Sequence, residues 1–114
     1  MSMKIAIPVA DGQLCMHFGH CTQFAILEAD LSAKRILSRT DKTPPPHAPG
    51  VLPDWLSKED VKLVIAGGMG RRAQQLFQEL GVDVLVGAPA QSPEALVEAY
   101  LNGSLSSGEN ICDH

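Results

Sequence analysis

Short apolar runs separated by polar turns fill the first half of the chain, a pattern that predicts strands. Residues 4–9 form an apolar run closed by Ala-Asp-Gly, which is typical of a buried first strand followed by a loop. Two more strands are predicted over residues 23–30 and 34–40, and the short polar segment between them suits a hairpin. Four prolines within residues 41–50 exclude a helix or a central strand there, and residues 51–60 have the apolar spacing of a short helix.

The second half has the pattern of a β-α-β unit. Residues 61–68 are a continuous apolar run that predicts a buried strand, and residues 82–89 predict another. Between them, residues 69–81 place apolar side chains at i, i+3, i+4 and i+7, which predicts a helix with one apolar face. That face consists of Ala73, Leu76, Phe77 and Leu80. Residues 92–103 begin with Ser-Pro-Glu and end with Gly, as a capped helix does.

These elements predict a single α/β domain over residues 1–114. A strand, a helix and a strand joined by short links form a parallel pair, whereas the first strands form a hairpin, so the sheet is expected to be mixed. The predicted fold class is therefore a three-layer α/β/α domain with a five-stranded mixed sheet and helices on both faces. Residues 103–114 follow neither periodicity, and we expect a mobile tail there.

Composition and charge narrow the range of functions. The chain has 114 residues, an apolar fraction of 45% and a net charge of −4. This acidity argues against nonspecific nucleic-acid binding, which needs a basic face. No apolar run approaches the roughly 18 residues that a membrane span needs. The N-terminus lacks the long apolar region of a secretory signal, so we expect a cytoplasmic protein. In a reducing compartment, clustered Cys and His more often indicate metal or redox chemistry than disulfides.

A glycine-rich turn joins the strand over 61–68 to the following helix. Gly67, Gly68 and Gly70 permit close backbone approach, and the helix start exposes free N–H groups and the positive end of its dipole. Arg71 and Arg72 add positive charge, so the turn is a candidate anion-binding site at the carboxyl edge of the sheet. The alternative is an ordinary tight turn with its arginines in solvent, because the sequence matches neither a dinucleotide fingerprint nor a P-loop.

The segment Cys-Met-His-Phe-Gly-His-Cys, residues 15–21, concentrates soft metal ligands. Thiolate and imidazole are the usual ligands of zinc, copper and iron–sulfur sites. Adjacent residues in an extended chain point to opposite sides, so we do not expect all four to hold one ion. The alternative makes Phe18 a core anchor and the others ordinary loop residues. The candidate ligands in this segment are Cys15, His17, His20 and Cys21.

A second pair of soft ligands, Cys112 and His114, lies at the end of the chain, where a mobile tail could fold over a bound ion or cluster. A terminal cysteine could equally be an incidental thiol. His47, within the proline-rich loop, is a weaker candidate. The acidic residues are scattered and no Ser-centred elbow motif is present, so no nucleophile and base can be paired and we do not expect an enzyme.

Taken in order, these segments resemble one protein family over nearly the whole chain. The segments HFGHCTQFAILEAD, PPPHAPGVLPDWL and VKLVIAGGMGRRAQQLFQELGVDVLVGAP resemble the dinitrogenase iron–molybdenum cofactor biosynthesis family. This is the NifX-like group, which includes the carboxyl-terminal domain of NifB and the orange protein. The resemblance implies a ribonuclease H-like fold, and a protein that binds, carries or stores a metal–sulfur cluster or its precursor.

The resemblance also assigns residues. The HFG turn of the family falls on His17, Phe18 and Gly19, and its glycine turn falls on Gly67, Gly68, Met69 and Gly70. Many members have Arg where this chain has His20, and lack Cys15 and Cys21, so this chain adds soft ligands. Arg71 and the glycine N–H groups would offset the charge of a thiometallate anion.

We therefore expect a carrier of an iron- or molybdenum-containing sulfide cluster, with a molybdenum–copper sulfide among the candidates. The cluster would lie between residues 15–21, residues 67–72 and the tail at 112–114. Expected partners are proteins that donate or accept the cluster, or ATPase proteins, and the chain itself is expected to be a monomer or a weak homodimer. Two alternatives stay open, namely a zinc or copper module that uses Cys and His alone, and a regulatory interaction domain.

Overall fold

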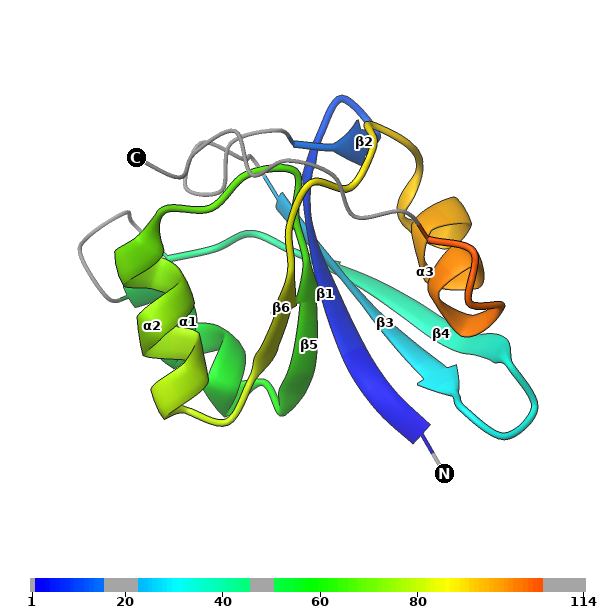
Figure 1. Ribbon diagram of the computed structural model, residues 1–114, viewed down its shortest axis with the longest axis horizontal. Coiled ribbons are helices and arrows are strands. Elements are labelled where there is room, and N and C mark those ends of the chain that lie inside the picture. Colours follow the sequence, from blue (N-terminus) through cyan, green and yellow to red (C-terminus); the bar gives the residue numbers. More distant parts are fainter. Residues whose placement is uncertain (1, 16–22, 46–50, 106–114) are drawn as a thin grey trace.

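The structure, a computed structural model, describes residues 2–15, 23–45 and 51–105 (Figure 1). Strands come first along the chain, and helices alternate with strands afterwards, as the apolar pattern predicts. The described elements are β1 (Ser2–Ala10), β2 (Gln13–Leu14), β3 (Gln23–Asp30), β4 (Arg35–Lys42), α1 (Val51–Lys58), β5 (Val61–Ile65), α2 (Arg71–Glu79), β6 (Asp83–Leu85) and α3 (Pro93–Leu101).

The sheet is mixed, with the strand order β4-β3-β1-β5-β6. β1 is antiparallel to β3 and parallel to β5, and β5 is parallel to β6. Within the described residues the sheet has six strands rather than the five predicted, because the two-residue strand β2 pairs with the end of β1. Asp11 and Gly12 make the turn between them, with φ of 55° and 79°, and an Asp-Gly pair with positive φ is the usual two-residue hairpin connection. The ribonuclease H-like assignment stays a prediction.

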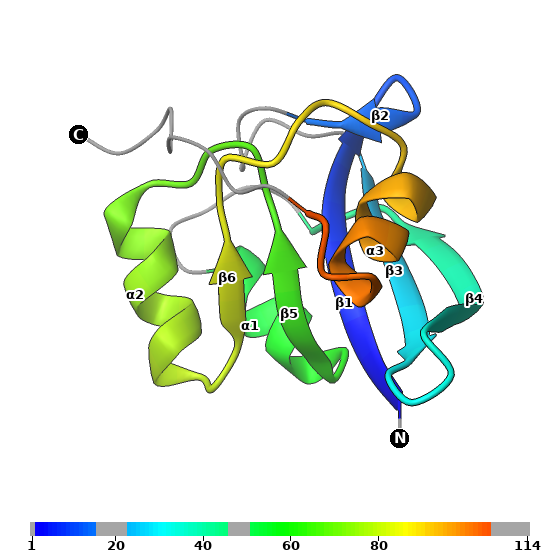
Figure 2. The same ribbon diagram turned by 45° about the vertical axis from the view of Figure 1, so that its right-hand side comes forward.

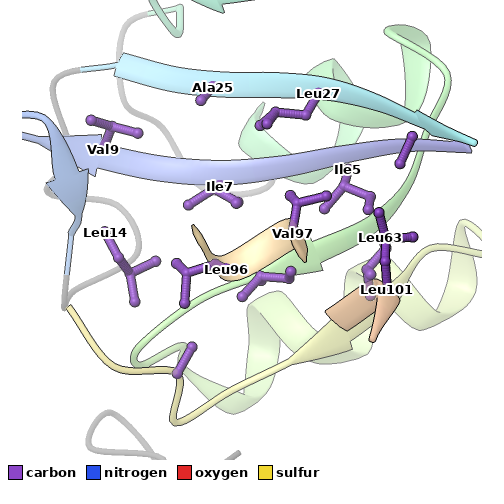
Figure 3. Packing of buried hydrophobic residues seen from close by; sticks show 13 residues of the cluster. Ile5, Ile7, Val9, Leu14, Ala25, Leu27, Leu63, Leu96, Val97 and Leu101 are labelled. Carbon is purple, nitrogen blue, oxygen red and sulfur yellow. The ribbon is translucent and has the colours of Figure 1, made fainter. Parts of the chain in front are cut away.

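Helices cover both faces of the sheet, as expected: α3 lies on one face, and α1 and α2 lie on the other (Figures 1 and 2). Because side chains alternate along a strand, the central strands β1, β3 and β5 contribute to two separate cores. On the α3 side, Leu96 and Val97 lie beside Ile5 and Ile7 of β1 (Figure 3). On the other side, Phe77 of α2 belongs to a second buried cluster with residues of α1, β1, β3 and β5.

An aromatic pair fixes helix α1 to the sheet, and Trp55 is the residue of α1 that takes part in it. The rings of Trp55 and Phe24 meet edge to face, with centroids 5.7 Å apart. Helix α2 follows its predicted face less closely. Phe77 is fully buried, whereas Leu80 is 43% exposed, because the helix ends at Glu79 and Leu80 is its C-cap residue.

Strand β4 forms one edge of the sheet, and most of its residues are exposed. Its pairing with β3 shifts register between Glu28 and Ala29, which is a β-bulge. Arg39 of this strand donates hydrogen bonds to Asp41 on the same strand and to Glu94 at the start of α3, so the edge strand is tied to the helix that covers it.

Candidate functional site

Three connections leave the sheet at the same edge, because β1, β5 and β6 are parallel to one another. They are the β1–β2 hairpin, the glycine turn from β5 to α2, and the loop from β6 to α3, which lie together at the top of Figure 1 and of Figure 2. The N–H of Leu14 donates to the carbonyl of Gln91 at 2.9 Å, which fastens the hairpin to the β6–α3 loop. Ligand sites of open α/β sheets lie at such an edge.

The glycine turn is built as a continuation of the β5–β6 pairing. The N–H of Ala66 donates to the carbonyl of Leu85 at 2.8 Å, and the N–H of Gly87 donates to the carbonyl of Gly67 at 2.9 Å. Gly67 and Gly68 are buried, whereas Gly70 is exposed. The first part of the turn is therefore held rigidly inside the fold, and only its last residue reaches the surface.

Met69 anchors the middle of this turn. Met69 is fully buried, in the core cluster that also contains residues of α1 and α2. Its carbonyl oxygen accepts a hydrogen bond of 2.9 Å from Nε2 of Gln74, in the first turns of α2. The sequence offered no signal for this contact, because a glutamine on a polar helix face is ordinarily solvated.

Gly70 is the N-cap residue of α2, and its backbone does not require glycine. Its φ of −64° and ψ of 155° suit any residue, and no side chain caps the helix. A Cβ atom added at Gly70 would meet nothing within 4 Å. Glycine is one of the residues favoured at an N-cap, but unlike Ser, Thr, Asp or Asn it has no side chain to make a capping bond, and the fold does not use its backbone freedom here.

The starts of α2 and α3 differ in charge. The first turn of α2 contains no acidic residue, and Arg71 and Arg72 are exposed there. Helix α3, in contrast, is capped by the Ser92 side chain and has Glu94 in its first turn. The positive end of the α3 dipole is thus balanced within the chain, whereas the α2 start combines the N–H groups of a helix N-terminus with an N-cap glycine and positive side chains.

Cys15 is the only predicted ligand with a described position. It follows β2 directly, is 9% exposed, and donates its backbone N–H to the carbonyl of Pro8 at 2.8 Å. It therefore lies at the same sheet edge as the glycine turn. No group of three or more His, Cys, Asp or Glu side chains within residues 2–15, 23–45 and 51–105 could hold a metal ion. The other predicted residues lie outside those ranges, namely His17, Phe18, Gly19, His20, Cys21, His47, Cys112 and His114.

A small polar cavity of about 80 Å³ lies elsewhere, on the α1 side of the sheet. Cross-strand pairing places Lys4 beside Glu28 and Glu28 beside Ser38, and Lys42 forms an ion pair with Glu59 at the wall. Sequence analysis missed it because only strand register brings these residues together. Its charges balance one another, so it offers less to an anion than the α2 start does.

The chain is similar to known proteins over most of its length. Residues 1–103 match the family described as dinitrogenase iron-molybdenum cofactor. The chain belongs to this family. A Methanocaldococcus jannaschii protein described as uncharacterized, MJ0580, is 28% identical over 110 residues, which cover 94% of this chain and 92% of that protein.

Solved structures share the fold of this family member. The crystal structure of PH0822 has a TM-score of 0.83 at 26% identity, with 93% of this chain and 96% of that chain covered. The apo form of the orange protein from Desulfovibrio gigas has a TM-score of 0.72 at 19% identity, with 95% and 94% covered. Among the described helices, none is long and apolar enough to cross a membrane.

Proposed function

We propose that this chain binds and carries an iron- or molybdenum-containing metal–sulfur cluster, or a precursor of one, at the glycine turn and the start of α2. Membership of the iron–molybdenum cofactor family supports a role in making or handling such a cofactor. The observation that carries the proposal is Gly70, an exposed N-cap glycine with an ordinary backbone conformation and open space where a side chain would be.

The chemistry of the α2 start matches an anion with a sulfide surface. A helix N-terminus stabilises an anion by about 0.3–1 kcal/mol at an exposed site, and several N–H groups can hydrogen-bond to sulfide. Arg71 and Arg72 add positive charge at a first turn that contains no acidic residue. Glycine at position 70 lets a large, rigid cargo reach the main chain.

Soft ligands supply the second half of the proposed site. Cys15 leaves the β1–β2 hairpin at the same edge of the sheet, and the residues that follow it carry His17, His20 and Cys21. We propose that this segment, with the tail residues Cys112 and His114, coordinates copper or iron at the periphery of the cluster. The protein would act in the cytoplasm between cluster donors and acceptors, and we assign it no catalytic step.

Anaerobic reconstitution of the full chain tests this function. Apoprotein is loaded with tetrathiomolybdate and copper(I), and separately with iron and sulfide, and is then desalted. We expect stoichiometric metal and a charge-transfer absorption band with one of the two. Absence of both would overturn the proposal.

Charge variants separate a cluster from a plain metal ion. Arg71→Ala and Arg72→Ala should weaken retention, whereas Arg35→Ala, which removes the same charge from exposed β4, should not. Retention of zinc or copper without sulfide, unaffected by Arg71→Ala, would instead identify a metal-ion module.

A further inference from the structure

Gln74 donates hydrogen bonds to two consecutive carbonyl groups, those of Met69 and Gly70. Its side-chain Nε2 donates to the carbonyl of Met69 at 2.9 Å, and its backbone N–H donates to the carbonyl of Gly70 at 3.2 Å. The second bond is the ordinary first hydrogen bond of α2. The first is a side-chain contact that the helix does not need, and Gln74 is partly buried where it makes it.

This contact sets the orientation of one peptide unit. The chain has no cis peptide bond in its described residues, and in a trans peptide the C=O and the N–H point in opposite directions. Because the Met69 carbonyl points toward Gln74, the N–H of Gly70 points away from Gln74. That N–H has no acceptor among the described residues, and Gly70 is exposed.

Without the contact, the peptide between Met69 and Gly70 would lose a hydrogen bond that fixes its orientation. A peptide unit flips by opposite changes in ψ of the residue before it and φ of the residue after it. Glycine adopts positive φ without steric penalty, so a glycine at position 70 makes such a flip inexpensive. A flipped peptide would turn a carbonyl oxygen toward an approaching anion in place of an N–H.

We propose that Gln74 is a positioning residue for the anion-binding turn, because it keeps the Gly70 N–H directed outward beside the N–H groups at the start of α2. This inference rests on the proposed function. The glycine opens the turn to the cargo, and Gln74 restores the rigidity that the glycine removes. A purely structural role, in which Gln74 only stabilises the start of α2, is the competing explanation.

A matched pair of glutamines tests the proposal. Gln74→Met keeps the length of the side chain and removes its donor, and Gln75→Met makes the same change at an exposed neighbour on the same helix. A single hydrogen bond contributes about 0.5–1.5 kcal/mol. We therefore expect Gln74→Met to weaken retention of tetrathiomolybdate with copper(I), or of iron with sulfide, by about 2- to 10-fold, because 1.4 kcal/mol corresponds to about tenfold. Gln75→Met should retain either cargo as the parent chain does.

The Gly70 amide resonance of the cargo-free chain gives an independent measurement. We expect one sharp ¹H–¹⁵N signal in the parent chain and in Gln75→Met, and a shifted or broadened signal in Gln74→Met. In Gln74→Glu the introduced carboxyl group can donate only when protonated, so the Gly70 signal should move toward its parent position as the pH is lowered.

The outcomes separate the two proposals. If the parent chain retains neither cargo, the proposed function fails, and the Gly70 signal still decides whether Gln74 orients the peptide. If the parent chain retains cargo and Gln74→Met retains it equally, the positioning role of Gln74 is wrong. If Gln74→Met only unfolds more easily and its Gly70 signal is unchanged, the structural explanation is supported and the positioning role of Gln74 is overturned.

Discussion

Replacing Gly70 by alanine should separate the stability of the fold from binding of the cargo. The φ of −64° and ψ of 155° at Gly70 suit alanine, and its Cβ would meet nothing within 4 Å. Loss of glycine's freedom in the unfolded chain stabilises by about 0.4–1 kcal/mol. Alanine is a poorer N-cap than glycine by a similar amount, of the order of 0.5–1 kcal/mol. The two effects oppose each other, so we expect the free energy of unfolding to change by less than about 0.5 kcal/mol.

Retention of the cargo, in contrast, should be weaker in Gly70→Ala than in the parent chain. The added methyl group would occupy the space that Gly70 leaves open at the start of α2, and it would keep a sulfide from the N–H groups behind it. Loss of one such hydrogen bond is worth about 1 kcal/mol, which corresponds to a weakening of about fivefold. Urea unfolding followed by circular dichroism, and metal content after anaerobic desalting, measure the two quantities on the same preparation.

Gly81 is the matched control at the other end of α2. Its φ is 77°, and a Cβ there would also meet nothing within 4 Å, so alanine would suffer backbone strain alone. We expect Gly81→Ala to destabilise the fold by about 1 kcal/mol and to leave retention by the folded protein unchanged. If Gly70→Ala retained cargo as the parent chain does, the assignment of Gly70 to the binding surface would be refuted.

Two further predictions concern the fold. Phe77→Ala removes a fully buried ring and should lower the free energy of unfolding by about 3–5 kcal/mol in urea titration, and a loss below about 1 kcal/mol would contradict the packing described for α2. The Arg39 guanidinium, by its hydrogen bond, lowers the pKa of Glu94. Because this folded-state pKa lies below the unfolded value, the stabilisation is present above the unfolded pKa and is lost as the pH falls through the folded pKa. The loss should be small because Glu94 is 43% exposed. Unfolding midpoints measured from neutral to acidic pH should fall less steeply in Arg39→Met, and identical slopes would exclude this linkage.

The pattern of apolar residues predicted most elements of this fold, because the helices bury one face and the central strands are apolar on both faces. The predicted strand over 23–30 coincides with β3, and Ser92 and Pro93 marked the start of α3 correctly. β2 was missed because two residues carry no periodicity, although the preceding Asp-Gly pair was a hairpin signal. Leu80 was placed on the buried face because a helical repeat does not show where the helix ends.

The glycine turn was predicted from the sequence, whereas the contacts that support it were not. Its assignment as a binding site stays a prediction. A glycine turn between a buried strand and a helix is visible in sequence, and so is the charge of Arg71 and Arg72. The contact of Gln74 with the Met69 carbonyl depends on where the turn folds back over α2, which no local pattern encodes. The polar cavity beside Lys4 and Glu28 likewise depends on the register between strands.

The bulge and the charges of β4 affect whether the sheet can pair with a strand of another molecule. An open edge strand is a template for another strand, and exposed charges together with a bulge make it a poor one. β4 has both, and the strand at the opposite edge, β6, is only three residues long. Both edges of the sheet are thus poor templates for pairing with another copy. Under the proposed function, a protein that delivers or receives cargo would dock on the loops above the sheet, where recognition and transfer can occur in one encounter.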